Sequence, residues 1–547
     1  MHSDEQFEIV AKTFRGLEDV LRDELISLGA HDVETGCRMV SFTGDKEMLY
    51  KANLCCRTAL RILKPIVKFK ASNPDELYDA VRDYDWDSLM SPDKTFSIDS
   101  TVNSAEFTHS RFVTYRVKDG IVDYFNDKYQ RRPSIRLSGA DVQLNVHISD
   151  DRVTISLDSS GEPLNKRGYR VEQTEAPINE VLAAGIILKT GWRGDCDFVD
   201  PMCGSGTFLI EAALIAANIN PGVYRQHYAF ETWEDFDKEL FSALYNDDSG
   251  ERTPGCRILG GDIARAAVAV AQKNIEAAGV EEFVSVECKS FAEWTEPPVE
   301  GILVTNPPYG ERLRPDDMAG LYKGIGSTLK NYFKGYHAWI IGYRDEYFRE
   351  IGLKPSVKFP ILNGALECEL REYVLFEGSY AQFREDGGSV ANRHFDREPR
   401  HKVRRMTDRE WDRESRKFGG KDHGRDRDRD RSKDHDRSRK FEKRQENRRT
   451  GEGGGREFDR NRGFGKERGR DFDRTREGFD NRKDSRRDGF KRGDGFKRRE
   501  DAPAPRRERT STDTLGKMPS LPESSATVFE NRRFRPRKGW KKDEGEK

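Results

Sequence analysis

The chain has 547 residues, 35% of them charged, and its formal net charge of −1 conceals an acidic part, residues 1–380, followed by a basic remainder. This length exceeds one ordinary domain, and so high a charged fraction predicts that part of the chain does not fold. The start, MHSDEQFEIV, has neither a basic segment nor an apolar run, and the most apolar later stretch, FLIEAALIAANI, is short and contains Glu211. We therefore expect a cytoplasmic protein without a membrane-inserted segment.

The eight cysteines predict neither a disulfide framework nor a metal centre. They include the adjacent pair Cys55 and Cys56, but no two are spaced as C-x-x-C, the pattern typical of a zinc site or a redox dithiol. We expect reduced thiols and no bound metal.

Residues 1–160 alternate short helices and strands. Apolar periodicity predicts helices over 16–29 and 116–129, and alternating residues predict strands within 141–160. This pattern indicates one or two small α+β modules.

Two basic stretches are candidates for phosphate contact in this otherwise acidic part. The first, SRFVTYRVKDGIVDYF, and the second, NKRGYR, contribute the residues Arg111, Arg116, Lys118, Lys166, Arg167 and Arg170. Clustered cations of this kind favour binding to RNA phosphates. The alternative is a solvated helix face and an ordinary charged linker.

Residues 165–380 alternate apolar strands with amphipathic helices. We expect strands at 196–200, 256–262, 283–288, 301–306, 337–343, 365–372 and 373–378, and helices at 206–218, 264–280 and 318–334. Such alternation predicts a doubly wound α/β domain. Ligands of such sheets bind outside the carboxyl ends of the strands, near the point where the strand order reverses.

A glycine turn follows the first of these strands. Gly204-Ser205-Gly206 lets the backbone approach a ligand closely, but it lacks the residues of a P-loop and the G-x-G-x-x-G pattern. Asp200 before the turn suits a ligand with an amino group, and Asp262 at the end of the second strand suits a ribose diol. An amino-acid moiety together with a ribose implies S-adenosylmethionine.

The segment Asn306-Pro307-Pro308-Tyr309 ends the fourth strand, which we expect beside the first. Each proline restrains its own φ and the conformation of the preceding residue, so this corner is rigid. The Asn306 side-chain oxygen and the Pro307 carbonyl can accept both hydrogens of one exocyclic amine, while Tyr309 stacks on the base. Two acceptors also stabilise the positive charge that develops on the attacking nitrogen. In isolation the same residues could form a simple loop.

Over residues 1 to about 380 the chain resembles the bacterial THUMP-domain class I methyltransferases that make N2-methylguanosine in 23S ribosomal RNA. The resemblance is carried by SRFVTYRVKDGIVDYF, NKRGYR, APINEVLAAGII, DPMCGSGTFLIEAALIAANINPG and TNPPYGERL. It implies a ferredoxin-like segment (1–50), a THUMP RNA-binding domain (51–160) and a Rossmann-like methyltransferase domain (165–380) that flips the target base.

The resemblance also implies roles for individual residues. Asn306, Pro307, Pro308 and Tyr309 would hold the guanine, and Asp262 the cofactor's ribose. The remaining cofactor residues would be Asp200, Met202, Gly204, Gly206, Ser290 and Asn306. Ser290 stands where relatives usually carry an acidic residue that binds the adenine amine. The second methyltransferase domain of some members is absent, so we expect a single methylation activity.

Apolar periodicity fades after about residue 385, and sequences such as RDRDRDR and RGFGKERGR take over. Such a segment cannot bury enough apolar surface to fold, so we expect a disordered tail over 385–547. It either contacts single-stranded RNA or serves only as a solubilising segment.

The sequence thus predicts an S-adenosylmethionine-dependent methyltransferase that acts on guanosine N2 in 23S rRNA, either naked or within a large-subunit assembly intermediate. One alternative is an N6-adenine methyltransferase on DNA or RNA, because adenine's amine fits the same corner. Another is a non-catalytic RNA-binding ribosome assembly factor.

Overall fold

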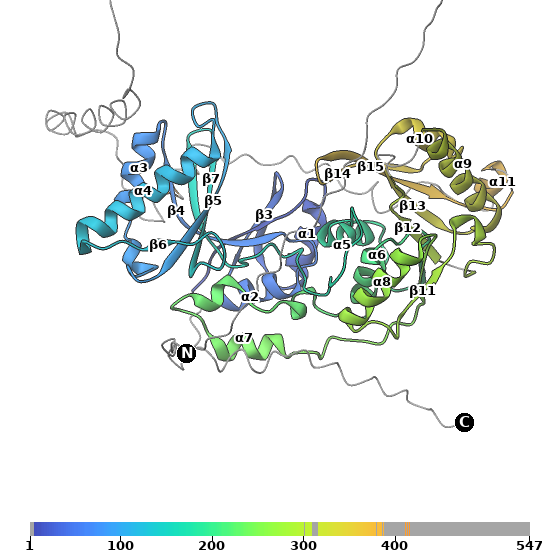
Figure 1. Cartoon of the computed structure of the whole chain (residues 1–547), viewed down its shortest axis with the longest axis horizontal. Coiled ribbons are helices and arrows are strands. Elements are labelled where there is room, and N and C mark those ends of the chain that lie inside the picture. The colour runs from blue at the N-terminus through green and yellow to red at the C-terminus, as the bar shows by residue number, and fades with distance from the viewer. Residues whose placement is uncertain are drawn as a thin grey trace, which may run out of the picture. The chain divides into compact units, whose positions relative to one another are not determined.

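The computed structural model describes residues 5–299, 301–308, 315–378 and 380–385, with Gly387, Trp411, Arg413 and Ser415. Except at Glu385 and these four positions, the predicted tail lies outside the described residues. Figure 1 shows the helices and strands of the described part. The strands form two sheets.

The first sheet has eight strands in the order β2-β3-β1-β4-β8-β7-β5-β6. Its strands are β1 (Phe7–Lys12), β2 (His31–Gly36), β3 (Met39–Gly44), β4 (Arg61–Lys70), β5 (Thr95–Asn103), β6 (Ser134–Ile135), β7 (Val142–Ser149) and β8 (Arg152–Asp158). Its helices are α1 (Glu18–Ser27), α2 (Lys46–Cys55), α3 (Pro74–Arg82) and α4 (Ser110–Tyr129), with a 3-10 turn, η1 (Trp86–Ser88). Alternate residues of β3 are buried, as expected for a strand with one face on a core.

Strand β4 joins the two expected modules into one sheet, because it pairs antiparallel with β1 on one side and with β8 on the other. A division between residues 50 and 51 would fall inside α2, which packs its buried side chains into the same core cluster as β1 and β3. The strands between Phe7 and Asp158 therefore form one continuous sheet.

The second sheet has seven strands in the order β11-β10-β9-β12-β13-β15-β14. They are β9 (Asp197–Asp200), β10 (Ile258–Asp262), β11 (Val284–Cys288), β12 (Gly301–Thr305), β13 (His337–Gly342), β14 (Val357–Asn363) and β15 (Leu366–Val374). The helices of this part are α5 (Glu180–Lys189), α6 (Thr207–Ala216), α8 (Arg265–Ala278), α9 (Pro315–Tyr332), α10 (Asp345–Glu350) and α11 (Tyr380–Glu385). The helix α7 (Lys238–Tyr245) lies among them in the chain but packs against α2 of the first sheet. Short 3-10 turns are η2 (Pro221–Tyr224), η3 (Ala229–Thr232) and η4 (Phe291–Glu293).

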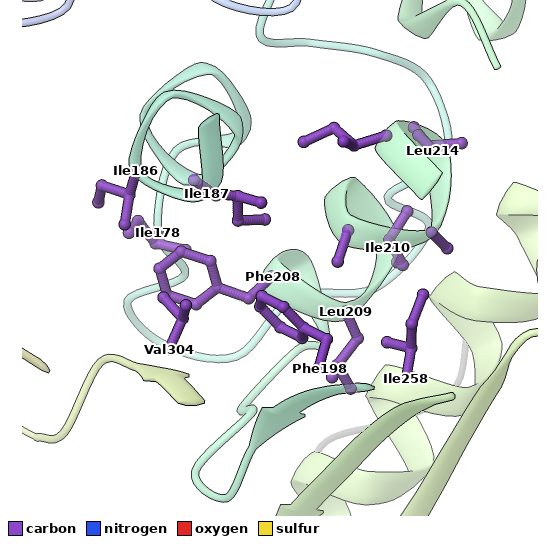
Figure 2. Packing of buried hydrophobic residues seen from close by; sticks show 14 of the residues in the cluster. Ile178, Ile186, Ile187, Phe198, Phe208, Leu209, Ile210, Leu214, Ile258 and Val304 are labelled. Atoms are coloured by element: carbon purple, nitrogen blue, oxygen red, sulfur yellow. The ribbon is translucent and has the colours of Figure 1, made fainter. Parts of the chain in front are cut away.

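Helices cover both faces of this sheet, which confirms the predicted doubly wound Rossmann-like fold. Phe198 of β9 and Val304 of β12 pack in one cluster with α5 and α6, whereas their neighbours Val199 and Leu303 pack in another with α9. Successive strand residues point to opposite faces, so both faces of a central strand need apolar residues. Figure 2 shows the first cluster, with Ile186 and Ile187 of α5 and several residues of α6 near Phe198.

The prediction of two final strands at 365–372 and 373–378 was wrong. Residues 366–374 form the single strand β15, and its hairpin partner is β14, which was not predicted from the sequence. Pro360 lies within β14 and obscured it, but this strand is at the edge of the sheet, where a proline is tolerated. Gly364, at φ 63°, supplies the turn of the hairpin.

Within the described ranges, no helix is both long enough and apolar enough to cross a membrane.

Candidate cofactor and acceptor site

The predicted site residues follow three strands that are neighbours in the sheet. β9 pairs in parallel with β10 on one side and with β12 on the other, so the strand order reverses at β9. The carboxyl ends of parallel strands meet at one edge. Asp200, Asp262 and Thr305 end these three strands and lie at that edge.

The glycine turn between β9 and α6 contacts the end of β10. Gly204 and Gly206 have φ values of 55° and 81°, a region that favours glycine. The Gly204 N–H donates to Asp262 Oδ2 at 3.0 Å, and the Cys203 N–H donates to the carbonyl of Gly261 at 2.9 Å. A Cβ atom built on Gly206 would lie 3.2 Å from the Cβ of Ala271, so the turn also packs tightly on α8.

Asp200 is buried at the centre of this edge, with 1% of its surface exposed. Its Oδ1 accepts hydrogen bonds from the Thr305 hydroxyl at 2.8 Å and from the Met202 N–H at 3.2 Å. Burial raises the pKa of Asp200 to about 7, and the nearby charge of Asp262 acts in the same direction, while both hydrogen bonds oppose the rise. A carboxyl group in this state favours a cationic ligand that restores its charge.

The acceptor corner begins directly after Thr305. Asn306 is half-buried, Pro307 is buried and Pro308 is exposed. Tyr309 lies outside the described residues. Because the Thr305 hydroxyl bonds to Asp200, the start of this corner is tied to the end of β9. The glycine turn, both aspartates and the start of the acceptor corner are therefore brought together.

Ser290 lies after β11, where the resemblance implies a contact to adenine. Its N–H donates to Glu293 Oε2 at 2.7 Å in the turn η4, and this bond lowers the pKa of Glu293. The preceding residue, Lys289, donates its N–H to the carbonyl of Asp262 at 3.0 Å. Ser290 therefore lies next to Lys289, whose backbone is bonded to the end of β10, and the next acidic side chain along the chain is Glu293.

Two residues of the site were missed by sequence reasoning. Thr305 looked like one more residue of an apolar strand, and only the sheet places its hydroxyl against Asp200. Ile263, beside Asp262, is 77% exposed, which is unusual for a large apolar side chain. The sequence signal was an isoleucine directly after the strand-ending aspartate.

The predicted RNA contacts on α4 differ in their surroundings. Arg111 is exposed. Arg116 donates through Nε to the Pro74 carbonyl at 3.0 Å and forms an ion pair with Asp75. Lys118 pairs with its neighbour Asp119 at 2.7 Å. Arg116 is thus engaged in joining α4 to α3, whereas Arg111 faces the solvent.

The structure places the two linker arginines in the interior and argues against RNA contact by either. Arg167 has a side chain only 2% exposed and pairs with Glu211 of α6. Arg170 is directed at the glycine turn, where it donates to the Ser205 hydroxyl at 3.0 Å. Both arginines of the linker therefore make structural contacts, because their guanidinium groups donate to buried acceptors. Lys166 remains exposed and pairs with Glu162.

All eight cysteines are unpaired thiols. Among the described residues, no three His, Cys, Asp or Glu side chains are grouped so that they could hold a metal ion.

Three family profiles match consecutive parts of the chain. They are the RlmL ferredoxin-like domain over residues 8–63, the THUMP domain over 71–158 and the RMKL-like methyltransferase domain over 167–372. The first match ends within β4, the strand shared by the two halves of the first sheet, and the second begins directly after it.

Known proteins are similar along most of this part. A protein of Synechocystis sp., provisionally named an RNA methyltransferase, is 38% identical over 67% of this chain and 96% of its own length. The ribosomal RNA large subunit methyltransferase K/L of Syntrophotalea carbinolica is 38% identical over 68% of this chain. The match covers 54% of that relative, so the chain spans about half the length of the K/L proteins it resembles.

Solved structures are also similar to this part of the chain. A crystal structure provisionally described as a methyltransferase, complexed with SAH, is 30% identical with a TM-score of 0.61, covering 69% of this chain and all of that one. A structure from Listeria monocytogenes, described as a predicted N6-adenine-specific DNA methylase, is 30% identical with a TM-score of 0.62, covering 68% and 97%. Both carry the same fold. The order of domains, the seven-stranded sheet and these likenesses together show that the chain belongs to the THUMP-containing class I methyltransferases of the RMKL-like family.

Proposed function

We propose that the chain is an S-adenosylmethionine-dependent RNA methyltransferase that transfers a methyl group to the exocyclic N2 of a guanosine in 23S rRNA. The observation that carries the proposal is the edge formed by β9, β10 and β12. There the glycine turn, flanked by Asp200 and Asp262, lies next to the acceptor corner that begins at Asn306. The K/L relatives, which are named as ribosomal RNA methyltransferases, support the substrate class.

The described residues fit the proposed cofactor. Asp200 is a buried carboxyl suited to an α-amino group, and the adjacent turn leaves the backbone free of side chains at Gly204 and Gly206. Asp262 still has acceptor capacity for a ribose diol beside its two backbone donors, and exposed Ile263 offers an apolar surface to the adenine ring. When bound, S-adenosylmethionine supplies an electrophilic methyl group.

The chain's own contribution is to hold the nucleophile. The Asn306 side-chain oxygen and the Pro307 carbonyl would accept the two hydrogens of the guanine amine, and Tyr309 would stack on the base. Two acceptors favour a pyramidal nitrogen and offset its growing positive charge, so a strong general base is unnecessary. Alignment contributes further, since positioning is worth up to roughly 7–11 kcal/mol in model reactions.

RNA binding is assigned to the exposed face of α4. Arg111, Phe112, Tyr115 and Lys118 recur at helical spacing, and Phe112 and Tyr115 are 50% and 61% exposed. Exposed rings between cations suit single-stranded RNA, whose bases stack and whose phosphates need positive partners. The substrate would be 23S rRNA or a large-subunit assembly intermediate.

The decisive experiment identifies the methylated nucleoside. RNA from a strain lacking the protein is incubated with the enzyme and labelled S-adenosylmethionine, digested and resolved into nucleosides. We expect N2-methylguanosine with the native chain and none with Asn306→Ala, while Asn246→Ala, an exposed asparagine on the surface, behaves as the native chain. N6-methyladenosine would contradict the choice of base and favour the rival activity, the one for which the Listeria protein is named.

Two further measurements address the RNA-binding part. Arg111→Ala with Lys118→Ala should weaken RNA binding and make its dependence on salt shallower by about one unit per lost phosphate contact, whereas Lys334→Ala should not. Normal growth of a strain that requires the protein but carries only Asn306→Ala would favour a non-catalytic assembly role.

A further inference from the structure

Arg170 lies in the segment between β8 and α5, and its guanidinium donates both to Ser205 and Thr207 at the glycine turn and to the start of α5. Its Nε donates to Glu180 Oε1 at 2.7 Å and its Nη1 to Ser205 Oγ at 3.0 Å. Its Nη2 donates to Thr207 Oγ1 at 3.0 Å and to the Ile178 carbonyl at 3.2 Å. One side chain thus joins the turn to the start of α5.

Backbone hydrogen bonds from Gly204 to Asp262 and from Gly206 to Cys203 hold the turn in part, but its glycines add no side-chain contacts. Glycine is the residue that loses most conformational freedom when it becomes ordered, and two of the three turn residues are glycines. Gly206 is also the N-cap of α6 and offers no side chain to cap it. The hydroxyls of Ser205 and Thr207, 3.3 Å apart, are the side-chain groups of this stretch that a donor from outside the turn can hold.

A second contact from the same linker supports this arrangement. Asn274 of α8 is 1% exposed, and its Oδ1 accepts the N–H groups of Val171 and Glu172 at 3.0 and 3.1 Å. Its Nδ2 donates to the Ser205 carbonyl at 3.0 Å. This segment therefore has two connections to Ser205. Arg170 bonds directly to the Ser205 hydroxyl, and Asn274 links the backbone of residues 171 and 172 to the Ser205 carbonyl.

We propose that Arg170 is a positioning residue for the methyl donor, which orders the Gly204–Gly206 turn by bridging the hydroxyls of Ser205 and Thr207. It replaces the RNA-binding role that the sequence suggested for this arginine. The inference rests on the proposed function only in taking this turn as part of the S-adenosylmethionine site.

Arginine suits this task where lysine does not. The planar guanidinium presents separate donors in a fixed geometry, so it can bond to two hydroxyls and a carboxylate at once. An ammonium is a point charge on a flexible stem and cannot span the same acceptors. Arg170→Lys therefore keeps the charge but loosens the turn, and it avoids an unpaired Glu180 that would endanger folding.

The test measures binding of S-adenosylhomocysteine to the full chain by titration calorimetry, without RNA. We expect Arg170→Lys to raise the dissociation constant about tenfold, the effect of losing one hydrogen bond to a charged group. At saturating S-adenosylmethionine, kcat should stay within about twofold of the native value, because the acceptor corner is unchanged. The loss thus appears in KM for the cofactor.

A matched control separates positioning from general stability. Arg252 donates through Nε to the carbonyl of Ala216 at 2.8 Å, at the opposite end of the same helix α6. Arg252→Lys should leave the affinity unchanged even if it lowers the melting temperature. Equal weakening by both variants, or native affinity in Arg170→Lys, would overturn the inference while the proposed function stood.

A double-mutant cycle gives a second readout. Ser205→Ala removes one acceptor of Arg170, so its effect and that of Arg170→Lys should overlap, and the double variant should bind more tightly than the product of the two losses predicts. Strictly independent losses would refute the bridging contact. A native chain that does not bind S-adenosylhomocysteine would defeat the proposed function and this inference together.

Discussion

Asp200→Asn should stabilise the protein at alkaline pH while weakening cofactor binding. Asp200 is 1% exposed, and burial raises its pKa from 3.8 to about 7. Asparagine has nearly the same shape, and its Oδ1 can accept the same hydrogen bonds from Thr305 and Met202. The substitution therefore removes the buried charge and preserves the contacts.

The sign and size follow from proton linkage. Between pH 3.8 and about 7 the folded chain keeps a proton that the unfolded chain has released, so the free energy of unfolding falls as the pH rises. The difference between 3.8 and about 7 corresponds to about 4 kcal/mol in the free energy of unfolding, which is lost in full above pH 7. The Asp200→Asn chain does not undergo this loss, because asparagine does not titrate. Its advantage should be about 2 kcal/mol at pH 5.5 and about 4 kcal/mol at pH 8.

The assay is urea unfolding of both chains at the two pH values, followed by tryptophan fluorescence, since Trp192 and Trp339 are buried in the core cluster that contains Phe198 of β9. A parallel titration with S-adenosylhomocysteine should show weaker binding by Asp200→Asn at pH 8, because the amide cannot pair with an α-amino cation. The same difference in stability at pH 5.5 and pH 8 would refute the buried-charge argument.

Three other substitutions test neighbouring contacts. Gly206→Ala should lower the free energy of unfolding by about 1–3 kcal/mol, because φ is 81° and the added Cβ would meet α8, as thermal unfolding would show. Arg167→Met should cost about 3–5 kcal/mol in urea unfolding, since it leaves the buried Glu211 without its cationic partner, although the Tyr169 hydroxyl still donates to it. Thr305→Val removes a hydrogen bond that lowers the pKa of Asp200, so affinity for S-adenosylhomocysteine should fall at pH 7 and recover partly at pH 9.

Each of these has an outcome that would contradict it. Gly320→Ala is the control for Gly206→Ala, because Gly320 is exposed within α9 and an added Cβ meets nothing within 4 Å. It should be neutral or stabilising. An equal loss of stability in Gly320→Ala would contradict the explanation given for Gly206→Ala. Glu211→Gln in the Arg167→Met chain removes the uncompensated charge but keeps an acceptor for the Tyr169 hydroxyl, so it should restore stability, and a further loss would refute the ion-pair explanation. Loss of affinity in Thr305→Val that is independent of pH would point to packing instead.

Much of the site followed from short stretches of sequence. The strands β9, β10, β11 and β12 were expected close to their observed bounds, because apolar runs between turn residues are legible in a window of a few residues. The glycine turn itself was also expected from the sequence, and the structure adds that Gly204 and Gly206 have positive φ values, which glycine adopts readily. Placing β12 beside β9 followed from the rules of doubly wound sheets.

The sequence by itself thus determined the fold class and the position of the glycine turn, both of which depend on local backbone preferences, and it predicts a rigid acceptor corner. Only the tertiary structure decided what Arg167, Arg170 and Thr305 do, because their partners are 44, 35 and 105 residues away. An arginine in a charged linker has the same local pattern whether it faces RNA or a buried carboxylate. The physical difference is burial, which is set by how distant elements pack and by which acceptors that packing brings within hydrogen-bonding distance.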